Sequence, residues 1–499
     1  MTSSMTPWSN VANFYADKKL FVTGATGFVG KVLIHKLLSA SPDIGGIYVL
    51  IRPKRGQEPK ERLKGVFEAP IFEGMPKHLL DKVVALAGDI TLPKLGLSEE
   101  DEATLVSEVS VVFHSAATVK FDDDLSKSVA MNIQGTLAVI ELARKMGSNL
   151  TSFVHVSTAY SHCYMEEIEE TFYTNESSPG EVIEMVKRIS ASVIDEPEMT
   201  KKLIGKHPNT YTFTKALAEQ AVQENASDLP LSIFRPSIVV ASAKEPVPGW
   251  VDNLNGPSGI SAGYASGILR TVHCDGSKRA DFIPVDMVIN MMCVIGWKTA
   301  KRGPIDRNNN TIPIYNYTSG GSNPFRWEDF QTYGRKHVQK YPLEFILWYP
   351  NGSIKASVIV DKICQVVYHF VPAMLFDLVL RLVGKKPYMW KLICKMTKAI
   401  QAVDYFLNNE WSWSNDNVHC LNDELSDEDK AVFNCDLRKL PHWDQFIGTY
   451  VQGIRQFLLK NKPSSLEASR RKLKLLYVAD CLLKVFLLFL LYQFLVWMF

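Results

Sequence analysis

The chain reads Val22-Thr23-Gly24-Ala25-Thr26-Gly27-Phe28-Val29-Gly30, directly after the apolar run 19–22 and directly before the helical pattern 31–39. A strand must turn sharply into a helix here, and Gly24 can adopt backbone angles that a Cβ atom would forbid. The missing side chain at Gly27 lets the backbone approach a pyrophosphate at the helix N-terminus, and Gly30 lets helix and strand pack closely. The stretch therefore predicts a dinucleotide-binding turn, and we include Thr26 and Phe28 among its ligand-binding residues.

Short apolar or β-branched runs continue the pattern at residues 47–51, 83–87, 111–114, 152–156 and 232–234. The segments between these runs are long enough for crossover helices. This alternation is typical of a doubly wound parallel sheet, so we expect an α/β fold of the Rossmann type.

The composition indicates a globular protein of the cell interior. The 499 residues can form one large domain and a smaller one. Charged residues make up 22% and the formal net charge is +2, which is too balanced to favour nucleic acid as a partner. The eight cysteines include no close pair with metal-ligand spacing, so we expect reduced thiols and no metal site. Residues 1–17 lack the apolar stretch of a signal peptide.

The last stretch of the chain departs from an ordinary soluble composition. Residues 475–499 are apolar apart from a few positions, chiefly Asp480, Lys484 and Gln493, and a basic cluster at 470–474 precedes them. Lys484 can extend to lipid headgroups, and the basic cluster suits an anionic cytosolic leaflet. We therefore expect a C-terminal membrane anchor. A buried terminal helix is the alternative, because the apolar part after Lys484 is shorter than the roughly 20 residues that a straight span needs.

A basic loop follows the second predicted strand. Arg52 stands where a cofactor with a free ribose 2′-hydroxyl would favour an acidic residue. A 2′-phosphate needs positive charge instead, and Arg52 with Lys54 or Arg55 can supply it. The loop therefore predicts NADP(H) rather than NAD(H); a solvated basic loop without a ligand is the alternative.

Further candidates follow the third and fourth predicted strands. Asp89 comes after the third strand and is expected to accept a hydrogen bond from the adenine amine. Ala116 and Ala117 come after the fourth strand, where small side chains leave room for the cofactor. Asn132 lies further along, and two roles are open for it: ordering a helix or holding a proton-relay water.

The segment Tyr211-Thr212-Phe213-Thr214-Lys215 carries the predicted chemistry. A helical residue and its fourth successor share a face, so the Tyr211 phenol and the Lys215 ammonium are expected in one site. An ammonium close to a phenol lowers a pKa that starts near 10, which makes Tyr211 a proton donor and acceptor near neutrality. Thr158, at the end of the fifth predicted strand, is expected to aim its hydroxyl at the same carbonyl oxygen, with Ser157 as the competitor.

These residues resemble the extended short-chain dehydrogenase/reductase superfamily and, within it, the fatty acyl-CoA reductases that make fatty alcohols. The resemblance covers most of the chain. The glycine turn and the tyrosine-lysine pair fit any extended member. The more specific blocks are Asn255-Gly256-Pro257-Ser258-Gly259, Gly267-Ile268-Leu269-Arg270 and Ile283-Pro284-Val285-Asp286.

The resemblance implies that a long-chain acyl-CoA is reduced to a primary alcohol by two NADPH, with release of CoA. It also implies that Lys215 holds the nicotinamide ribose and that Pro236 contributes to the cofactor site. The sequence offers no cysteine in the context of a nucleophile, so we expect no acyl-enzyme. The expected location is an intracellular membrane with the catalytic part facing the cytosol, and both endoplasmic reticulum and peroxisome remain open.

Two other functions share part of this pattern. A membrane-associated sterol dehydrogenase of the same superfamily would have the glycine turn, Tyr211, Lys215 and an anchor, but it would usually prefer NAD, against the basic loop. A non-catalytic NADP-binding scaffold would have no need of Thr158, Tyr211 and Lys215 together.

The resemblance and the composition predict five regions. They are an N-terminal extension (1–17), an NADP-binding reductase domain (18–300), a connecting region on the substrate side (301–361), a smaller, mainly helical C-terminal domain (362–460) and the basic segment with its membrane anchor (470–499).

Two features of the C-terminal part have several interpretations. Residues 366–383 are strongly apolar, but His369, Pro372, Asp377 and Arg381 interrupt them and argue against a simple span. A tunnel wall, a membrane-facing helix and a core helix all fit this segment. Trp411 and Trp413 fit either a membrane interface or the core.

Overall fold

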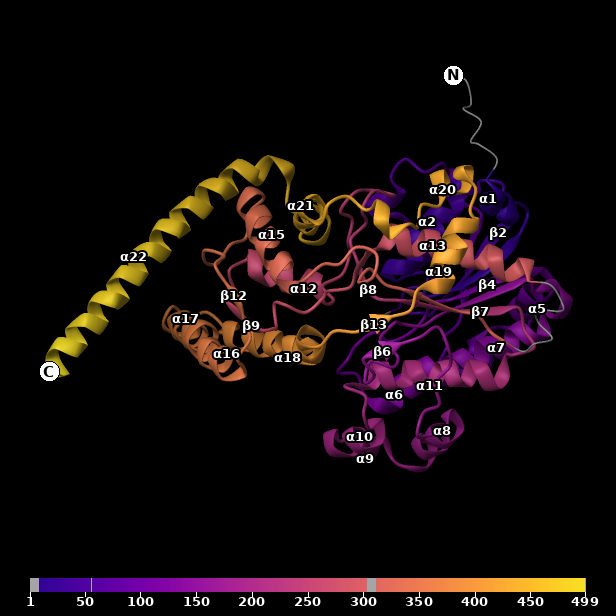
Figure 1. Ribbon diagram of the computed structural model, residues 1–499, viewed down its shortest axis with the longest axis horizontal. Coiled ribbons are helices and arrows are strands. Elements are labelled where there is room, and N and C mark those ends of the chain that lie inside the picture. Colours follow the sequence, from indigo (N-terminus) through magenta and orange to yellow (C-terminus); the bar gives the residue numbers. More distant parts are fainter. Residues whose placement is uncertain (1–8, 55, 303–310, 499) are drawn as a thin grey trace, which may run out of the picture. The chain divides into compact units, whose positions relative to one another are not determined.

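The computed structural model describes residues 9–54, 56–302 and 311–498 (Figure 1). The predicted phosphate ligand Arg55 lies outside the described residues, as do parts of the predicted N-terminal and connecting regions. Two compact units are present. Unit 1 contains the described residues of Met1–Val247, Asp281–Pro324 and Trp411–Leu440. Unit 2 contains those of Pro248–Ala280, Phe325–Glu410 and Pro441–Phe499.

A seven-stranded parallel sheet forms the centre of unit 1, in the order β11-β7-β5-β4-β1-β2-β3. The strands are β1 (Lys19–Thr23), β2 (Gly46–Ile51), β3 (Val83–Ala87), β4 (Val109–His114), β5 (Ser152–Val156), β7 (Leu231–Pro236) and β11 (Ile314–Tyr317). Every residue of β5 and β7 is buried, as expected for a parallel sheet covered on both faces. The predicted doubly wound α/β fold is confirmed.

Helices cover both faces of this sheet (Figure 1). α2 (Phe28–Ala40) and α13 (Val285–Lys301) pack together on one face, and α7 (Gly135–Lys145) and α11 (Thr210–Asn225) pack together on the other. α13 is apolar nearly all round and buries fourteen of its residues against α2, β5 and β7. Such a helix belongs to the interior of a large core.

The strand order places the site. β1 pairs with β2 on one side and with β4 on the other, so Thr23 at its carboxyl end lies beside both Leu50 and His114. In open parallel sheets a ligand binds outside the carboxyl ends of the strands, where the strand order reverses. That point lies here between β1 and β4.

Smaller elements complete unit 1. Its other helices are α1 (Asn10–Tyr15), α3 (Pro59–Phe67), α4 (Lys77–Leu80), α5 (Glu99–Glu108), α6 (Leu125–Val129), α8 (Pro179–Arg188), α9 (Ala191–Ile194), α10 (Pro197–Ile204), α19 (Asp416–Glu424) and α20 (Asp427–Val432). Two short parallel pairs join β8 (Ile238–Val240) to β10 (Phe282–Pro284) and β6 (Glu167–Ile168) to β13 (Ser412–Trp413).

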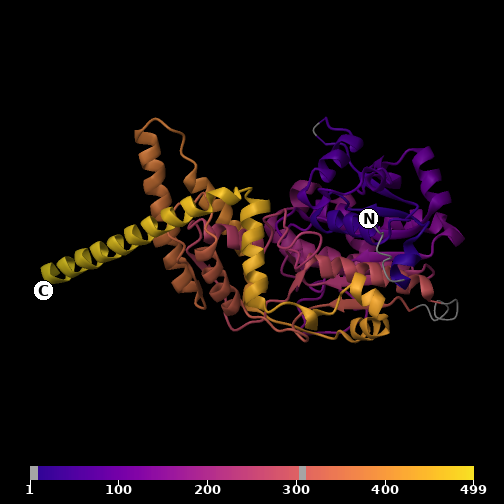
Figure 2. The same cartoon turned by 90° about the horizontal axis from the view of Figure 1, so that it is seen from above.

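Unit 2 is mainly helical (Figure 2). Its helices are α12 (Pro257–Ala265), α15 (Trp327–Lys340), α16 (Val358–Gln365), α17 (Val371–Leu382), α18 (Met389–Asn408), α21 (Trp443–Gly453) and α22 (Leu466–Met498), and its parallel strand pair is β9 (Thr271–His273) with β12 (Ser353–Lys355). The π-helical turn η5 (Val366–Phe370) joins α16 to α17 without a break. A Cβ atom on Gly453 would lie 1.6 Å from the carbonyl oxygen of Gly249, so glycine permits this close approach of two segments.

Two helices of the described chain are long and apolar enough to cross a membrane, over Val358–Leu382 and Pro463–Met498. α22 buries only Ser469, Leu473 and Asp480. The alternative of a buried terminal helix is therefore wrong, and the exposed apolar tail weakly indicates membrane association.

Candidate active site

The glycine turn at the end of β1 is packed against the segment that follows β4. Gly24 has a φ of +81°, and a Cβ atom there would lie 2.8 Å from Ser115 Oγ and 2.9 Å from the Ala116 nitrogen. A Cβ atom on Gly30 would lie 2.3 Å from the carbonyl oxygen of Gly24. Gly27 caps α2 and is exposed, so the helix N-terminus is open to a ligand.

The other residues predicted for this turn lie around it. Thr26 and Phe28 are half-buried on either side of Gly27. Ala116 and Ala117 are half-buried beyond the end of β4, and the Ala116 N–H donates to Thr23 Oγ1 at 3.2 Å. The arrangement leaves backbone rather than side chains around the helix N-terminus, which fits a pyrophosphate.

Two arginine side chains, with Lys54 in the same loop, lie beyond β2. Arg52 lies 3.8 Å from the Asp89 carboxylate and is half-exposed. The Arg62 guanidinium, on α3, donates to the carbonyl oxygen of Arg52, and the two guanidinium charges are close enough to repel. Lys54 forms a backbone bridge with Gln57 in the same loop. Arg62 was not predicted from the sequence, because its only signal is a helix that starts seven residues after Arg52.

The Asp89 carboxylate is bonded to neighbouring residues of the protein. Its carboxylate accepts from the Thr91 N–H at 3.0 Å and from the Thr91 hydroxyl at 2.9 Å, and its other oxygen faces Arg52. These contacts order the turn after β3. The adenine contact predicted for Asp89 stays a prediction.

Tyr211 and Thr158 meet at the start of α11. Asn209 caps this helix by accepting from the Thr212 N–H at 2.9 Å, which fixes the first turn that carries Tyr211. The phenol is half-buried and hydrogen-bonds Thr158, and its ring stacks on Phe121 at 5.6 Å between centroids. Phe121 lies in the loop after β4 and had no signal in the sequence.

Lys215 lies one turn further along α11 and is buried. Its ammonium donates to the carbonyl oxygen of Val156, at the end of β5, at 2.8 Å. The predicted group of Thr158, Tyr211 and Lys215 thus gathers where β5 meets α11. Pro236, at the end of β7, accepts from the Ala159 N–H at 3.0 Å and so lies beside the Thr158 segment.

The acid-base properties of the site are set by burial. Burial raises the pKa of Tyr211 to about 12, and the hydrogen bond from Thr158 opposes this rise. Burial lowers the pKa of Lys215 to about 8, and the charge of Glu219 opposes this fall. The expectation that Lys215 lowers the phenol pKa is wrong for the protein alone, because the ammonium is turned to the Val156 carbonyl.

A buried ion pair holds α11 against β7. Arg235 and Glu219 are both fully buried, and the guanidinium donates to both carboxylate oxygens, at 3.0 and 2.5 Å. Ser157 also donates to Glu219, and His162 lies 3.4 Å from it. Because Ser157 is engaged there, its role as the competitor of Thr158 is not favoured.

Asn132 connects the β4 loop to α11. It lies in the π-helical turn Ala130–Gln134, accepts from the Thr118 N–H at 3.0 Å and donates to Thr214 Oγ1 at 2.9 Å. Of the two roles left open, ordering of a helix is the one these contacts support. Such π-turns are frequent at functional sites.

Two tryptophans from late in the sequence brace the Thr158 segment. Trp413 Nε1 donates to the carbonyl oxygen of Ala159 at 3.0 Å, and Trp411 Nε1 donates to that of Cys163 at 2.8 Å. Both rings meet the buried Tyr160 ring edge-on, at 5.3 and 5.5 Å. The tryptophans are therefore core residues of unit 1, and the membrane-interface interpretation is wrong.

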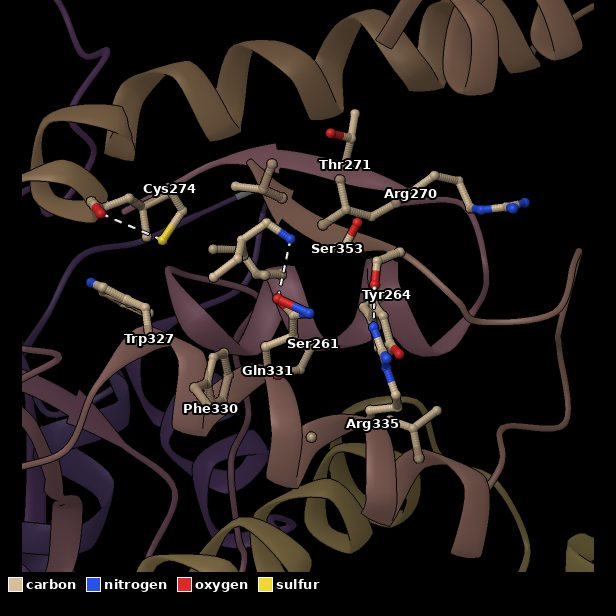
Figure 3. A pocket seen from close by; sticks show the side chains of 18 of the residues that line it. Ser261, Tyr264, Arg270, Thr271, Cys274, Trp327, Phe330, Gln331, Arg335 and Ser353 are labelled. Carbon is tan, nitrogen blue, oxygen red and sulfur yellow. Dashed lines mark hydrogen bonds between the residues drawn. The ribbon is translucent and has the colours of Figure 1, made fainter. Parts of the chain in front are cut away.

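Unit 2 contains an apolar cavity of about 80 Å³ (Figure 3). Trp327 and Phe330 of α15 form one wall. Opposite them lie Thr271 of β9, Ser353 of β12 and Cys274, which directly follows β9. The remaining wall comes from α12, Leu407 and Val451. The lining is almost entirely apolar, as in most small-molecule sites.

Comparisons with known proteins find similar family models and similar reductases. Two family models match, both described as male sterility protein, over residues 22–292 and 368–461. Fatty acyl-CoA reductase 1 of Xenopus laevis is 40% identical over 467 residues, which cover 93% of this chain and 89% of the relative. The Homo sapiens reductase 1 is 39% identical with the same coverage, and Homo sapiens fatty acyl-CoA reductase 2 is 38% identical over 469 residues.

Solved structures share the fold at lower identity. The terminal R domain of the myxalamid biosynthetic pathway is 20% identical with a TM-score of 0.54, and the match covers 90% of this chain and 93% of that one. The reductase domain of a Mycobacterium tuberculosis nonribosomal peptide synthetase is 16% identical with a TM-score of 0.57, covering 89% and 94%. At these identities the likeness concerns the fold alone.

Proposed function

The chain belongs to the fatty acyl-CoA reductases and reduces fatty acyl-CoA to the alcohol, and from this premise we propose that NADPH is the hydride donor and that Thr158, Tyr211 and Lys215 form the catalytic site. The observation that carries the proposal is the meeting of Tyr211 and Thr158 hydroxyls beside the carboxyl end of β5. The relatives do not favour the sterol dehydrogenase or the non-catalytic scaffold.

The residues of the glycine turn fit a dinucleotide. Close packing of Gly24 and Gly30 and the open N-terminus of α2 make a cradle that a Cβ atom would fill. Thr26, Gly27, Phe28, Ala116 and Ala117 would surround the pyrophosphate and nicotinamide ends. When bound, the reduced nicotinamide supplies the hydride for each of two reductions.

The protein groups act on the oxygen of the substrate. As each hydride reaches the carbonyl carbon, negative charge develops on the oxygen, and the Tyr211 and Thr158 hydroxyls donate to it. Tyr211 then transfers its proton to that oxygen. Lys215 would hold the nicotinamide ribose, which is the other role expected for it.

The first product is a hemithioacetal. When its C–S bond breaks, CoA leaves as the thiolate, the Tyr211 phenolate takes back the hydroxyl proton and the aldehyde forms. The aldehyde then takes the hydride of a second NADPH and the Tyr211 proton, which gives the alcohol, and solvent returns a proton to Tyr211.

The choice of NADPH rests on the cationic cluster beyond β2. Arg52 and Arg62 lie close together, and Lys54 stands in the same loop. Clustered guanidinium groups suit a phosphate, whereas a ribose hydroxyl favours an acidic partner. Asp89 pairs with Arg52 and would orient it toward the 2′-phosphate.

A product assay tests the reaction as a whole. We expect purified full-length protein with palmitoyl-CoA and NADPH to form hexadecanol, oxidising two NADPH for each alcohol and releasing one CoA. Product analysis by mass spectrometry with parallel absorbance readings measures this ratio. Aldehyde as the only product, with one NADPH oxidised, would contradict the two-step proposal.

Arg52→Ala tests the 2′-phosphate contact. We expect NADPH affinity to fall roughly ten- to a hundredfold, since a hydrogen bond to a charged group contributes about 1.5–3 kcal/mol, while NADH affinity stays nearly constant. Titration of both cofactors by fluorescence measures the two changes. Arg188→Ala, an exposed arginine on α8, is the matched control. Equal losses for both cofactors would remove this part of the proposal.

The apolar cavity of unit 2 is the candidate site for the acyl chain. Gly334 of α15 lines it, and a Cβ atom there meets nothing within 4 Å, so a larger side chain would occupy cavity space. We expect Gly334→Leu to lower kcat/KM for the longest acyl-CoA by roughly tenfold or more, since overfilling costs about 1–3 kcal/mol, and to spare shorter chains. Gly180→Leu on α8, another unobstructed glycine, is the control. A loss independent of chain length would contradict this assignment.

The exposed apolar helices support an intracellular membrane as the location, with the catalytic part facing the cytosol. Arg470, Arg471, Lys472 and Lys474 precede the apolar part of α22 and suit an anionic cytosolic leaflet. Endoplasmic reticulum and peroxisome both fit, and microscopy of the tagged full-length chain distinguishes them.

A further inference from the structure

The apolar helix Val358–Leu382 turns two carboxylates and a histidine inward. Asp361, His369, Ala373 and Asp377 are all buried and lie on one stripe at multiples of four residues. The stripe faces the rest of unit 2, since α16 packs against β9 and α17 packs against α18.

Each polar member of this stripe has a partner. Asp361 accepts from the Thr271 hydroxyl at 2.5 Å, and His369 accepts from the Arg270 N–H at 2.9 Å. Asp377 accepts from three successive backbone N–H groups, of residues 388–390, at 2.9–3.0 Å and so caps α18. Of the residues that argued against a membrane span in the sequence, His369 and Asp377 are therefore satisfied inside the protein.

The opposite face of the same helix is exposed and apolar. Its members include Ile359, Ile363, Val366, Val367, Val371, Met374, Leu375, Leu378, Val379 and Leu382, each at least 40% exposed. Between Lys362 and Arg381 the only ionisable carboxyl or ammonium group is the buried Asp377. Water-soluble proteins place the polar face of a surface helix outward, so this arrangement is reversed and marks an interaction surface.

The flanks of the surface carry the groups that suit lipid headgroups. Arg381, Lys385, Lys386 and Lys391 are exposed at the junction of α17 and α18. Tyr388 and Trp390, in the same junction, are about half-exposed. Cationic groups next to amphipathic aromatic rings are typical of the boundary between headgroups and acyl chains.

The tail helix is fixed to the same part of unit 2. Asp480 of α22 is buried, where it accepts from Trp348 Nε1 at 2.6 Å and Asn351 Nδ2 at 2.9 Å and lies 3.6 Å from the Arg270 guanidinium. Arg270 also holds His369 through its N–H and lies over the Tyr368 ring. One residue thus connects the tail to the helix Val358–Leu382.

We propose that the outward face of Val358–Leu382, together with the basic α17–α18 junction, is a second membrane-binding surface that lies in the anionic cytosolic leaflet without crossing it. A crossing would place the inward stripe of carboxylates and histidine among lipid chains, at a high cost. A face that is apolar at its centre and cationic with aromatic rings at its flank matches a leaflet with anionic headgroups.

Site-specific photocrosslinking of the full chain tests the proposal. A benzophenone amino acid replaces Leu375, and the protein is reconstituted into phosphatidylcholine vesicles with or without phosphatidylserine that carry a traceable lipid. A second protein carries the same probe at Leu487 of α22. Lipid labelling at Leu487 shows that the tail has inserted, and Leu375 is measured under the conditions that give this labelling. We expect lipid labelling at Leu375 several-fold above that at Leu254, an exposed apolar residue of unit 2 outside this helix.

A charge-reversal variant tests whether the basic α17–α18 junction contributes to lipid binding. Lys385→Glu with Lys386→Glu should reduce lipid labelling at Leu375 several-fold in phosphatidylserine vesicles while labelling at Leu487 stays constant. Labelling at Leu375 that equals the Leu254 background, or that joins a second copy of the chain instead of lipid, would overturn the proposal. Labelling that ignores both the charge reversal and phosphatidylserine would overturn the assignment to an anionic leaflet.

Discussion

Tyr211→Phe should abolish nearly all alcohol formation, lowering kcat by roughly 10²–10⁴-fold, because the variant keeps the ring and loses the proton that the substrate oxygen must receive. The ring packing on Phe121 survives the change, so the fold and the cofactor cradle should be unaffected. The checks are steady-state alcohol production and NADPH binding by titration. Binding of NADPH should change little.

The matched control is Tyr48→Phe, which removes a hydroxyl bonded to Glu108 at a half-buried position on β2. This variant should keep wild-type activity. Full activity in Tyr211→Phe would disprove the assignment of the proton donor, even if the chain reduces acyl-CoA. A loss of NADPH binding as large as the loss of activity would show that Tyr211 serves the cofactor instead.

Arg235→Met should destabilise unit 1 by about 3–5 kcal/mol, because it leaves the buried Glu219 carboxylate without its main counter-charge. Burial alone would raise the pKa of Glu219, but Arg235 and His162 lower it well below its usual range. The carboxylate is therefore ionised in the wild-type protein, whereas in the variant burial raises its pKa, so the loss should be largest at high pH and shrink as the pH falls. Denaturant unfolding of the full chain, followed by tryptophan fluorescence, measures the change.

Two further variants distinguish the effect of breaking the ion pair from the effect of removing a long side chain. Arg235→Met with Glu219→Met should recover much of the lost stability, since paired replacement of a buried ion pair by apolar groups is often neutral. Arg144→Met removes the partner of Asp228 at a half-exposed position and should cost at most about 1 kcal/mol. A similar small loss in Arg235→Met would show that the pair contributes little to holding α11 against β7.

Local patterns in the sequence sufficed for six of the seven strands and for the helix that carries Tyr211, but the edge strand β11 was not predicted. The apolar runs correspond to buried strands because a parallel sheet covered on both faces needs no alternation. Gly24 could be interpreted directly, since its positive φ and the close approach of Ala116 are requirements that only glycine meets. The roles of Tyr211, Lys215 and Thr158 stay predictions, as do the five domain ranges.

Contacts between distant segments had no signal in the sequence. Nothing near Thr158 indicates that Trp413 will donate to Ala159, because such partners depend on the path of the whole chain. The predicted lowering of the Tyr211 pKa was wrong for a related reason. The spacing along α11 indicates that Lys215 lies one turn from Tyr211, but it does not indicate that the ammonium donates to the Val156 carbonyl. His369 and Asp377 interrupted an apolar pattern in the sequence, and only the tertiary structure shows that they face inward.

The parallel pairing of β13 with β6 has a consequence for how the enzyme is made. A nascent chain that has left the ribosome through Lys215 already contains every proposed catalytic group, yet Trp411 and Trp413 are still untranslated. Until they arrive, the backbone after Thr158 lacks the two indole donors that hold it. A transcript that stops before codon 411 would therefore encode all the chemistry and no working enzyme.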